Sequence, residues 1–321
     1  MNDKRLLIID GLNMFLRSYI INPTMDPKGV AIGGCVGFLK SLQKCVRDYH
    51  PNEVIIAWDG HGGSQKKRSI NKNYKEGRKP LRFNRRMIKL DEQEQAKNKA
   101  YQQIRTMQYI NDLPIIQVII DYVEADDIIS YVVQHDKYKD YNKLIVSSDK
   151  DFYQLVDEKT AIFRPIQKKV ITLPIILEDF GIHPNNFALA RAIAGDPSDN
   201  LKGVPRVGLK TVSKKFEFLS SPFEVDLDTV MEHCHKVDKQ LQVHKNILSH
   251  KALIENNYDI MQLYKPNMAR TNKSVIDYAI SNFEFEYNKM GFTKMLFSDG
   301  IGSTDFSSLF RVCADITNLN Q

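Results

Sequence analysis

Cysteine is scarce in this chain, and its spacing suits neither a disulfide framework nor a zinc site. The four cysteines are Cys35, Cys45, Cys234 and Cys313, and no two of them form a Cys-x-x-Cys pair. The segment His233-Cys234-His235 offers metal-binding side chains, but the charged helical pattern around it favours a structural role. We therefore expect a reducing, cytoplasmic setting.

Long hydrophobic runs are also absent. Residues Met1–Arg5 lead directly into the short apolar run Leu6–Ile9, which Asp10 ends. Such a run is too short for a signal peptide or a membrane span, so we expect no membrane partner. The hydrophobic content of 42% and the charged content of 26% are typical of a globular protein with a substantial core. The length of 321 residues suits one large domain or two ordinary ones.

Positive charge is concentrated in one internal segment. Between His61 and Lys89, eleven lysines and arginines stand against one acid, Glu76, so this segment carries +10 and the rest of the chain −4. A basic run is usually a solvated face or a disordered tail. This one lies between a predicted strand and a predicted helix, which favours a polyanion partner such as nucleic acid.

Strand and helix patterns alternate over the first two-thirds of the chain. Apolar runs typical of strands lie at Arg5–Asp10, Glu53–Asp59, Ile115–Ile119 and Lys143–Ser147, with a short pair at Ala161–Phe163 and Lys169–Leu173. Helices are predicted at Val30–Tyr49, Leu90–Asn111 and 125–133, and after Pro184 at Phe187–Gly195, Leu209–Phe218, Thr229–Val243 and Ile276–Phe283. This order predicts an α/β domain over residues 1–185, with a central, mainly parallel sheet flanked by helices, and an all-helical region over residues 186–321.

Acidic residues follow four of these strands, at the point where each strand ends. Asp10 and Asp59 end the first two strands, and Asp149 and Asp151 follow the fourth. The third strand is followed, at the start of a helix, by Glu124, Asp126 and Asp127. Because the carboxyl ends of parallel strands share one edge, we expect these acids to meet there. One such aspartate is usually a cap or turn residue, but four strands ending in acids indicate a site.

A cluster of this kind must stay partly protonated or bind cations. Its ligands are all oxygen atoms, which favours Mg²⁺ or Mn²⁺ over zinc. Two such ions about 4 Å apart stabilise both the attacking and the leaving oxygen in phosphodiester hydrolysis. Asp196 and Asp199 would ordinarily mark a turn, but they can fold back to complete the site of a second ion. Among the three acids that open the helix, we expect Glu124 and Asp126 to bind first.

Basic residues and glycines predict contacts with a phosphate backbone. Gly203 and Gly208 would let backbone amides approach a phosphate, although the segment taken alone also fits an ordinary helix–turn–helix connection. Lys75 and Arg78, three residues apart, could clamp a phosphate near the ions, or belong to a flexible lysine-rich loop. We predict DNA-binding roles for Tyr74, Lys202, Gly203, Val204, Arg206, Gly208, Lys210, Thr211, Lys214 and Lys215.

These motifs together resemble the 5′-nuclease family, which includes flap endonucleases, bacteriophage 5′–3′ exonucleases, ribonuclease H-type primer removers and the N-terminal nuclease domain of bacterial DNA polymerase I. The similar segments lie in family order between about residues 5 and 217. They are Leu7–Gly11, Trp58–Gly60, Tyr74–Arg78, Glu124–Asp127, Ser147–Asp151, Gly195–Asn200 and Gly203–Gly208. Leu81-Arg82-Phe83 departs from the proline-rich continuation of polymerase-linked members.

The resemblance implies a PIN-like α/β nuclease domain with a helical arch at about residues 65–110. It also implies a helix–three-turn–helix element at about residues 186–220 that often holds K⁺. By position, Asp10, Asp59, Glu124, Asp126 and Asp149 resemble the residues around a first metal ion. Asp127, Asp151, Asp196 and Asp199 resemble those around a second. Lys75 and Arg78 resemble the arch residues that steer the scissile phosphate.

We therefore predict a Mg²⁺-dependent 5′-nuclease that removes RNA primers or 5′ flaps from branched or nicked DNA and RNA–DNA hybrids, as in DNA replication, and acts as a monomer. A non-catalytic branched-DNA-binding protein is one alternative, but the expected acids are all present. A PIN-type ribonuclease acting on single-stranded RNA is another, but it would not explain Gly203–Gly208. A sliding clamp or single-strand-binding protein is a conceivable partner, although Ser308-Leu309-Phe310 lacks the leading glutamine of a clamp-binding peptide.

Overall fold

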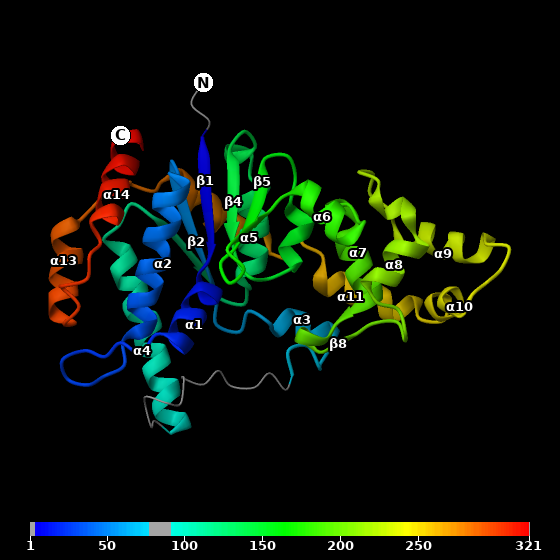
Figure 1. The fold of residues 1–321 in the computed structure, drawn as a ribbon, viewed down its shortest axis with the longest axis horizontal. Helices are drawn as coiled ribbons and strands as arrows, with labels where there is room; N and C mark the ends of the chain where they lie inside the picture. Colours follow the sequence, from blue (N-terminus) through cyan, green and yellow to red (C-terminus); the bar gives the residue numbers. More distant parts are fainter. Residues whose placement is uncertain (1–3, 77–90, 321) are drawn as a thin grey trace.

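The computed structural model describes residues 4–76 and 91–320, and it confirms the predicted mainly parallel sheet flanked by helices (Figure 1). The described residues form a sheet in the order β3-β2-β1-β4-β5-β6. Its strands are β1 (Arg5–Asp10), β2 (Glu53–Asp59), β3 (Ile116–Ile120), β4 (Asn142–Val146), β5 (Thr160–Arg164) and β6 (Lys169–Ile171). Neighbouring strands from β3 to β5 pair in parallel, whereas β6 pairs antiparallel with β5 and completes the predicted strand pair.

The central strand β1 explains why the sheet is covered on both faces. Its residues Leu6–Ile9 are fully buried, and Ile9 lies beside Ile56 of β2 and Val146 of β4. A strand that is apolar on both sides must pack between two layers. Because β1 to β5 run in the same direction, their carboxyl ends lie at one edge of the sheet, which we call the carboxyl edge.

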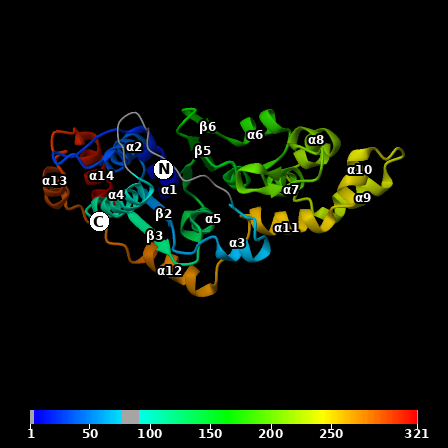
Figure 2. The ribbon, with the colours of Figure 1, turned by 90° about the horizontal axis from the view of Figure 1, so that it is seen from below.

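Helices cover both faces of the sheet. One face is covered by α1 (Gly11–Ile21), α2 (Gly33–Tyr49), α4 (Glu92–Asn111), α13 (Lys289–Ser298) and α14 (Ser307–Asn320). The core on the other face includes residues of α5 (Ala125–Val133), α6 (Leu173–Phe180), α7 (Pro184–Ala194), α8 (Leu209–Lys215), α9 (Leu227–Lys236), α10 (Gln242–Leu248), α11 (Lys251–Met261) and α12 (Arg270–Ser281). The short helix α3 (Gln65–Ile70) lies beside α11, as Figure 2 shows.

The core continues across the boundary predicted near residue 185. Phe187 of α7, Val212 of α8 and Ile254 of α11 belong to the same buried cluster as Leu6 and Ile8 of β1. The last helices return to the opposite face, where Phe292 of α13 and Leu309 of α14 share a core with β1 and α2. The division into two domains stays a prediction, and so does the arch, because part of it falls on residues 77–90, outside the described residues.

The predicted single helix Thr229–Val243 is wrong, because the chain forms two helices there, α9 and α10. The break has a local cause. Gln240 donates from Nε2 to the carbonyl oxygen of Cys234 at 3.1 Å, which satisfies a free carbonyl at the end of α9. The Nδ1 atom of His244 accepts from the backbone N–H of Leu241 at 3.3 Å and caps the start of α10. Helices α1, α3, α6, α11, α13 and α14 were not predicted from the pattern.

Within residues 4–76 and 91–320, the helices are all too short or too polar to cross a bilayer.

The C-terminal region of the chain is bound to α4 through one aspartate. Asp299, just past α13, is 8% exposed and accepts from Nε and Nη2 of Arg105 at 2.7 and 2.9 Å. The hydroxyl of Tyr109 donates to the same carboxylate at 2.6 Å. This connection fixes α4 against the C-terminal end of the chain.

We expect Asp299→Asn to lower the free energy of unfolding by about 1.5 kcal/mol, because it weakens charge-assisted hydrogen bonds to the partly buried Arg105. Equilibrium unfolding in urea measures this change. Asp315→Asn, an exposed site on α14, is the matched control and should change stability by less than about 0.5 kcal/mol. Equal effects of the two substitutions would contradict the bracing role.

Candidate metal centre

Asp10 begins the site because it ends β1 and also caps α1. Its Oδ1 accepts from the backbone N–H of Asn13 at 3.1 Å, and its Oδ2 accepts from the hydroxyl of Ser147, just past β4, at 2.8 Å. Burial raises the pKa of Asp10 to about 7, and the nearby carboxylates of Asp59 and Asp149 act in the same direction. The first strand end is therefore tied directly to the fourth.

Asp59 ties the second strand end to the helix that follows β3. Its Oδ1 accepts from the backbone N–H of Ala125 at 2.9 Å, which is the first residue of α5. Glu124 and Asp126 stand on either side of this contact, at the start of α5. Burial raises the pKa of Asp126 well above its usual value, and Asp149 and Glu124 contribute further repulsion. Acids from four strand ends thus gather at the carboxyl edge, as the sequence predicted.

Two lysines supply the counter-charge that these acids need. Glu124 is 3% exposed, with Nζ of Lys67 at 2.7 Å and Nζ of Lys75 at 2.6 Å. Burial opposes ionisation of Glu124, but the two ammonium groups outweigh it and lower its pKa to about 2. Lys67 also lies 4.0 Å from Asp126. Sequence reasoning missed Lys67, which is 5% exposed, because it was counted within the basic segment rather than as a partner of the acids.

Lys75 connects this group with the acids that come later in the chain. It adopts a left-handed backbone conformation with φ of 55°, which is uncommon for a residue with a side chain. Its backbone N–H donates to the carbonyl oxygen of Asp199 at 2.9 Å, while its ammonium group reaches Glu124. Arg78, predicted to act with Lys75, lies outside the described residues.

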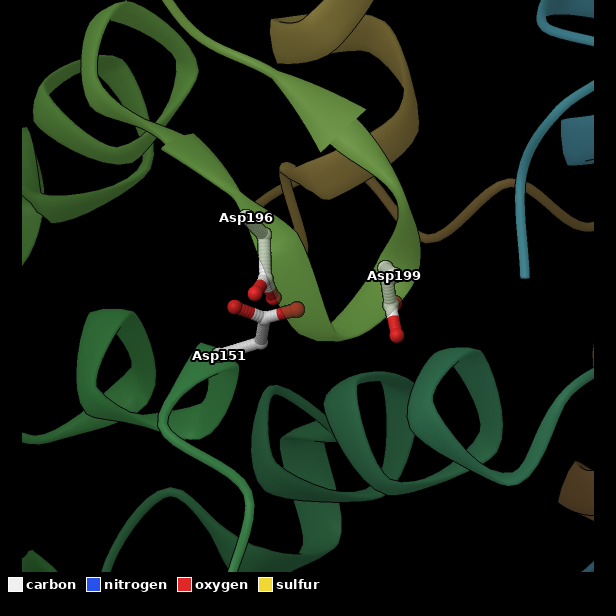
Figure 3. A group of neighbouring side chains, drawn as sticks. All are labelled: Asp151, Asp196 and Asp199. Atoms are coloured by element: carbon white, nitrogen blue, oxygen red, sulfur yellow. The ribbon is translucent and has the colours of Figure 1, made fainter. Parts of the chain in front are cut away.

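Asp151, Asp196 and Asp199 form the second carboxylate group. Asp151 begins the 3₁₀ helix η2 (Asp151–Leu155), and the other two lie on the hairpin of β7 (Gly195–Asp196) and β8 (Leu201–Lys202). Among the described residues, this is the group in which three carboxylate oxygens lie within 4.8 Å of one another. Figure 3 shows the carboxyl groups of Asp151 and Asp196 facing each other, with Asp199 on the same hairpin as Asp196.

Arg191 of α7 lies against this second group and was also missed from the sequence. Its Nη2 atom is 2.6 Å from Oδ1 of Asp151 and 2.6 Å from Oδ2 of Asp196. Burial raises the pKa of Asp151 to about 7, with Asp149 adding repulsion and Arg191 opposing the shift. The only sequence signal for Arg191 was its position on the helix just before the hairpin.

Asp127, which the resemblance assigned to a second metal ion, makes a contact that was not predicted, and its metal role stays a prediction. Asp127 is 5% exposed, and its Oδ1 accepts from the backbone N–H of Asn267, between α11 and α12, at 2.8 Å. One residue along an α-helix turns the side chain by about 100°, so adjacent acids face different ways. Asp126 faces the carboxyl edge, whereas Asp127 fastens the returning C-terminal segment.

The predicted DNA-binding residues separate into exposed and buried ones. Lys202, Arg206, Gly208, Lys210, Lys214 and Lys215 are exposed, and Thr211 is half-buried. Tyr74 and Val204 are 2% and 3% exposed, which favours a packing role for both; their predicted DNA contacts stay predictions. Tyr74 packs with Leu201 and Met261. Burial stabilises its largely apolar ring.

Gly203 has a packing role rather than an open approach to phosphate. A Cβ atom there would lie 2.1 Å from the carbonyl oxygen of Ala194, so only glycine lets the hairpin pack this closely against the end of α7. Gly208 has open space around it, as the prediction required.

The donor set fits a hard divalent cation. Each predicted ligand offers carboxylate oxygens, which Mg²⁺ and Mn²⁺ prefer, and the second carboxylate group is compact enough to share one ion. Lys67, Lys75 and Arg191 already balance part of the negative charge.

Comparisons with known proteins agree with this site. The model of the 5′-3′ exonuclease N-terminal resolvase-like domain matches residues 5–181. The 5′-3′ exonuclease of Buchnera aphidicola subsp. Schizaphis graminum is 32% identical over 219 residues, covering 66% of this chain and 71% of that protein. The thermostable DNA polymerase I of Thermus thermophilus is 26% identical over 241 residues, covering 74% of this chain, which spans only 26% of that protein.

Among solved structures, the bacteriophage T5 flap endonuclease in a pseudo-enzyme-product complex with DNA and metal ions superposes with a TM-score of 0.65. Its sequence identity is 17%, and the match covers 94% of this chain and 100% of that one. At this identity the superposition establishes the shared fold.

The contrast between two adjacent acids gives a first test of the site. Asp126→Asn removes a charge at the carboxyl edge and should weaken Mn²⁺ binding roughly tenfold or more. Asp127→Asn keeps an oxygen acceptor for the N–H of Asn267 and should leave Mn²⁺ binding within about twofold of the parent. Isothermal titration calorimetry measures the Mn²⁺ affinity of both variants. An equal loss of affinity in the two would show that Asp127 also binds the metal.

The raised pKa values of Asp10 and Asp151 predict a pH-dependent stability in EDTA. Both carboxyls titrate near 7 in the folded chain and near about 3.9 when unfolded, so between these values the folded state binds more protons. The free energy of unfolding should therefore fall as the pH rises from about 4 to about 7. Urea unfolding at about pH 5 and about pH 8 measures this change in the free energy of unfolding. Greater stability at the higher pH would refute the prediction.

Proposed function

The chain belongs to the 5′-3′ exonuclease family, and from this premise we propose that it is a divalent-metal-dependent, structure-specific 5′-nuclease. Its substrates are branched or nicked DNA and RNA–DNA hybrids, from which it removes 5′ flaps or RNA primers. The observation that carries the proposal is the meeting of acids from four strand ends, which include the second carboxylate group shared with the adjacent hairpin.

We assign the first ion to the acids around Glu124 and Asp126, and the second to the second carboxylate group. Asp10, Asp59 and Asp149 complete the surroundings of the first ion. Mg²⁺ is the preferred cation, with Mn²⁺ as a substitute, because the ligands are all oxygens. A pair of such ions supplies charge stabilisation for in-line phosphodiester hydrolysis, leaving a 5′-phosphate.

Lys75 is the residue of this chain that we propose to bind the scissile phosphate. Its ammonium group is held beside Glu124, with 19% of the side chain exposed, so it can reach a phosphate at the carboxyl edge. A cation beside Glu124 would compete with Lys75 for that carboxylate and leave the ammonium group for the substrate. Arg78 is proposed to act with it on the arch.

The duplex would lie along the exposed basic residues that follow the hairpin. Lys202, Arg206 and Lys210 are exposed within six residues of the open Gly208, and Lys214 and Lys215 continue the exposed basic residues to the end of α8. Contacts of this kind bind the phosphate backbone without reading bases. The helix–three-turn–helix with bound K⁺ is proposed for α7, the hairpin and α8.

Cleavage of a labelled 5′-flap DNA tests the proposal. With Mg²⁺ the chain should release the flap, and EDTA should abolish the reaction. Asp151→Asn should lower the rate by roughly a hundredfold or more, because it removes one charge from the second carboxylate group. Asp140→Asn, at a surface ion pair with Lys159, is the matched control and should cleave at the parent rate.

The same assay separates the alternatives. Tight binding of the flap without cleavage would indicate a non-catalytic branched-DNA-binding protein. Cleavage of single-stranded RNA alone would indicate a PIN-type ribonuclease.

A further inference from the structure

Arg191 makes an unusual pair of contacts within the second carboxylate group. A single nitrogen, Nη2, lies 2.6 Å from both Asp151 and Asp196, which come from separate elements, η2 and β7. Arg191 is 8% exposed, so both ion pairs are shielded from solvent. The guanidinium therefore holds together two acids that would otherwise repel each other across the group.

Asp196 has both of its carboxylate oxygens engaged by protein groups. Its Oδ2 pairs with Arg191, and its Oδ1 accepts from the backbone N–H and the hydroxyl of Ser198 at 2.9 and 2.7 Å. Asp151 has its Oδ1 engaged by the same guanidinium. A cation that enters this group thus competes with hydrogen bonds that the chain already makes.

The guanidinium is held by its contacts with the two acids, although one of its donors is unsatisfied. Its Nε is buried and lacks a hydrogen-bond partner among the residues that the structure describes. An unsatisfied buried donor is costly, so the contacts with the two carboxylates must outweigh that cost. Arginine keeps its charge at any physiological pH, which makes this a fixed positive charge inside the site.

The charge balance with a cation bound shows what this fixed charge does. When a cation has displaced any proton from the three carboxylates, they carry −3, and Arg191 reduces the group to −2, which one divalent cation neutralises. We propose that Arg191 is a resident counter-cation that positions Asp151 and Asp196 and weakens the hold of the second carboxylate group on divalent cations. This inference rests on the proposed function, and it adds a positioning residue that moderates ion affinity at that site.

Mn²⁺ binding by the full chain without DNA tests the role of Arg191, with free Mn²⁺ followed by electron paramagnetic resonance. The parent should show a class of weakly bound ions at the second carboxylate group. Arg191→Gln removes the charge and should tighten that class roughly tenfold. Arg191→Lys keeps the charge and should bind within about threefold of the parent.

Arg47→Gln is the matched control, because Arg47 pairs with Asp48 on the surface, and it should bind as the parent does. If Arg191→Gln folds and its weakly bound class of Mn²⁺ ions has the same affinity as in the parent, or a lower one, the proposed role of Arg191 is overturned. If that variant does not fold, a tenfold tightening in Arg191→Lys would overturn the charge argument by itself. Failure of the parent to bind Mn²⁺ would instead reject the proposed function, and the inference with it.

Discussion

Electrostatic repulsion among buried acids at the carboxyl edge is the constraint on which the rest of the site depends. A parallel sheet brings its strand ends together, and this chain places an acid at four of them. Buried carboxylates without counter-charges would take up protons or drive the edge apart. Lys67, Lys75 and Arg191 come from three different elements to meet them, so α3, the turn that carries Lys75 and α7 are all bound to the same edge.

The C-terminal half of the chain encloses this edge through backbone contacts. Gln154, in the helix that Asp151 begins, donates to the carbonyl of Met261 at 3.0 Å and accepts from the N–H of Leu263 at 2.6 Å. The N–H of Asn267 is held by Asp127, and its carbonyl accepts from Lys66 of α3 at 3.1 Å. The segment between α11 and α12 is thereby fixed to α3, α5 and η2, which are the elements that carry the charged groups.

The fold and the location of the site were predictable because they depend on local patterns. Apolar runs located the main strands to within a residue or two, and the acids at their ends could be placed at one edge by the rule for parallel sheets. The partners of these acids were not predictable. Lys67 and Arg191 are ordinary basic residues in the sequence, and their burial beside acids is decided by contacts between segments far apart in the chain.

The same limit explains the residues whose contacts differ from those expected. Tyr74 and Val204 lie within motifs for which we predicted DNA contacts, but a motif does not tell which of its side chains face inward. Asp126 and Asp127 make the point most directly, because they are the same residue type at adjacent positions. The turn of α5 sends one to the carboxyl edge and the other to Asn267. Proximity in sequence brings acids to a site, but helix rotation and the returning C-terminal segment decide which partner each of them contacts.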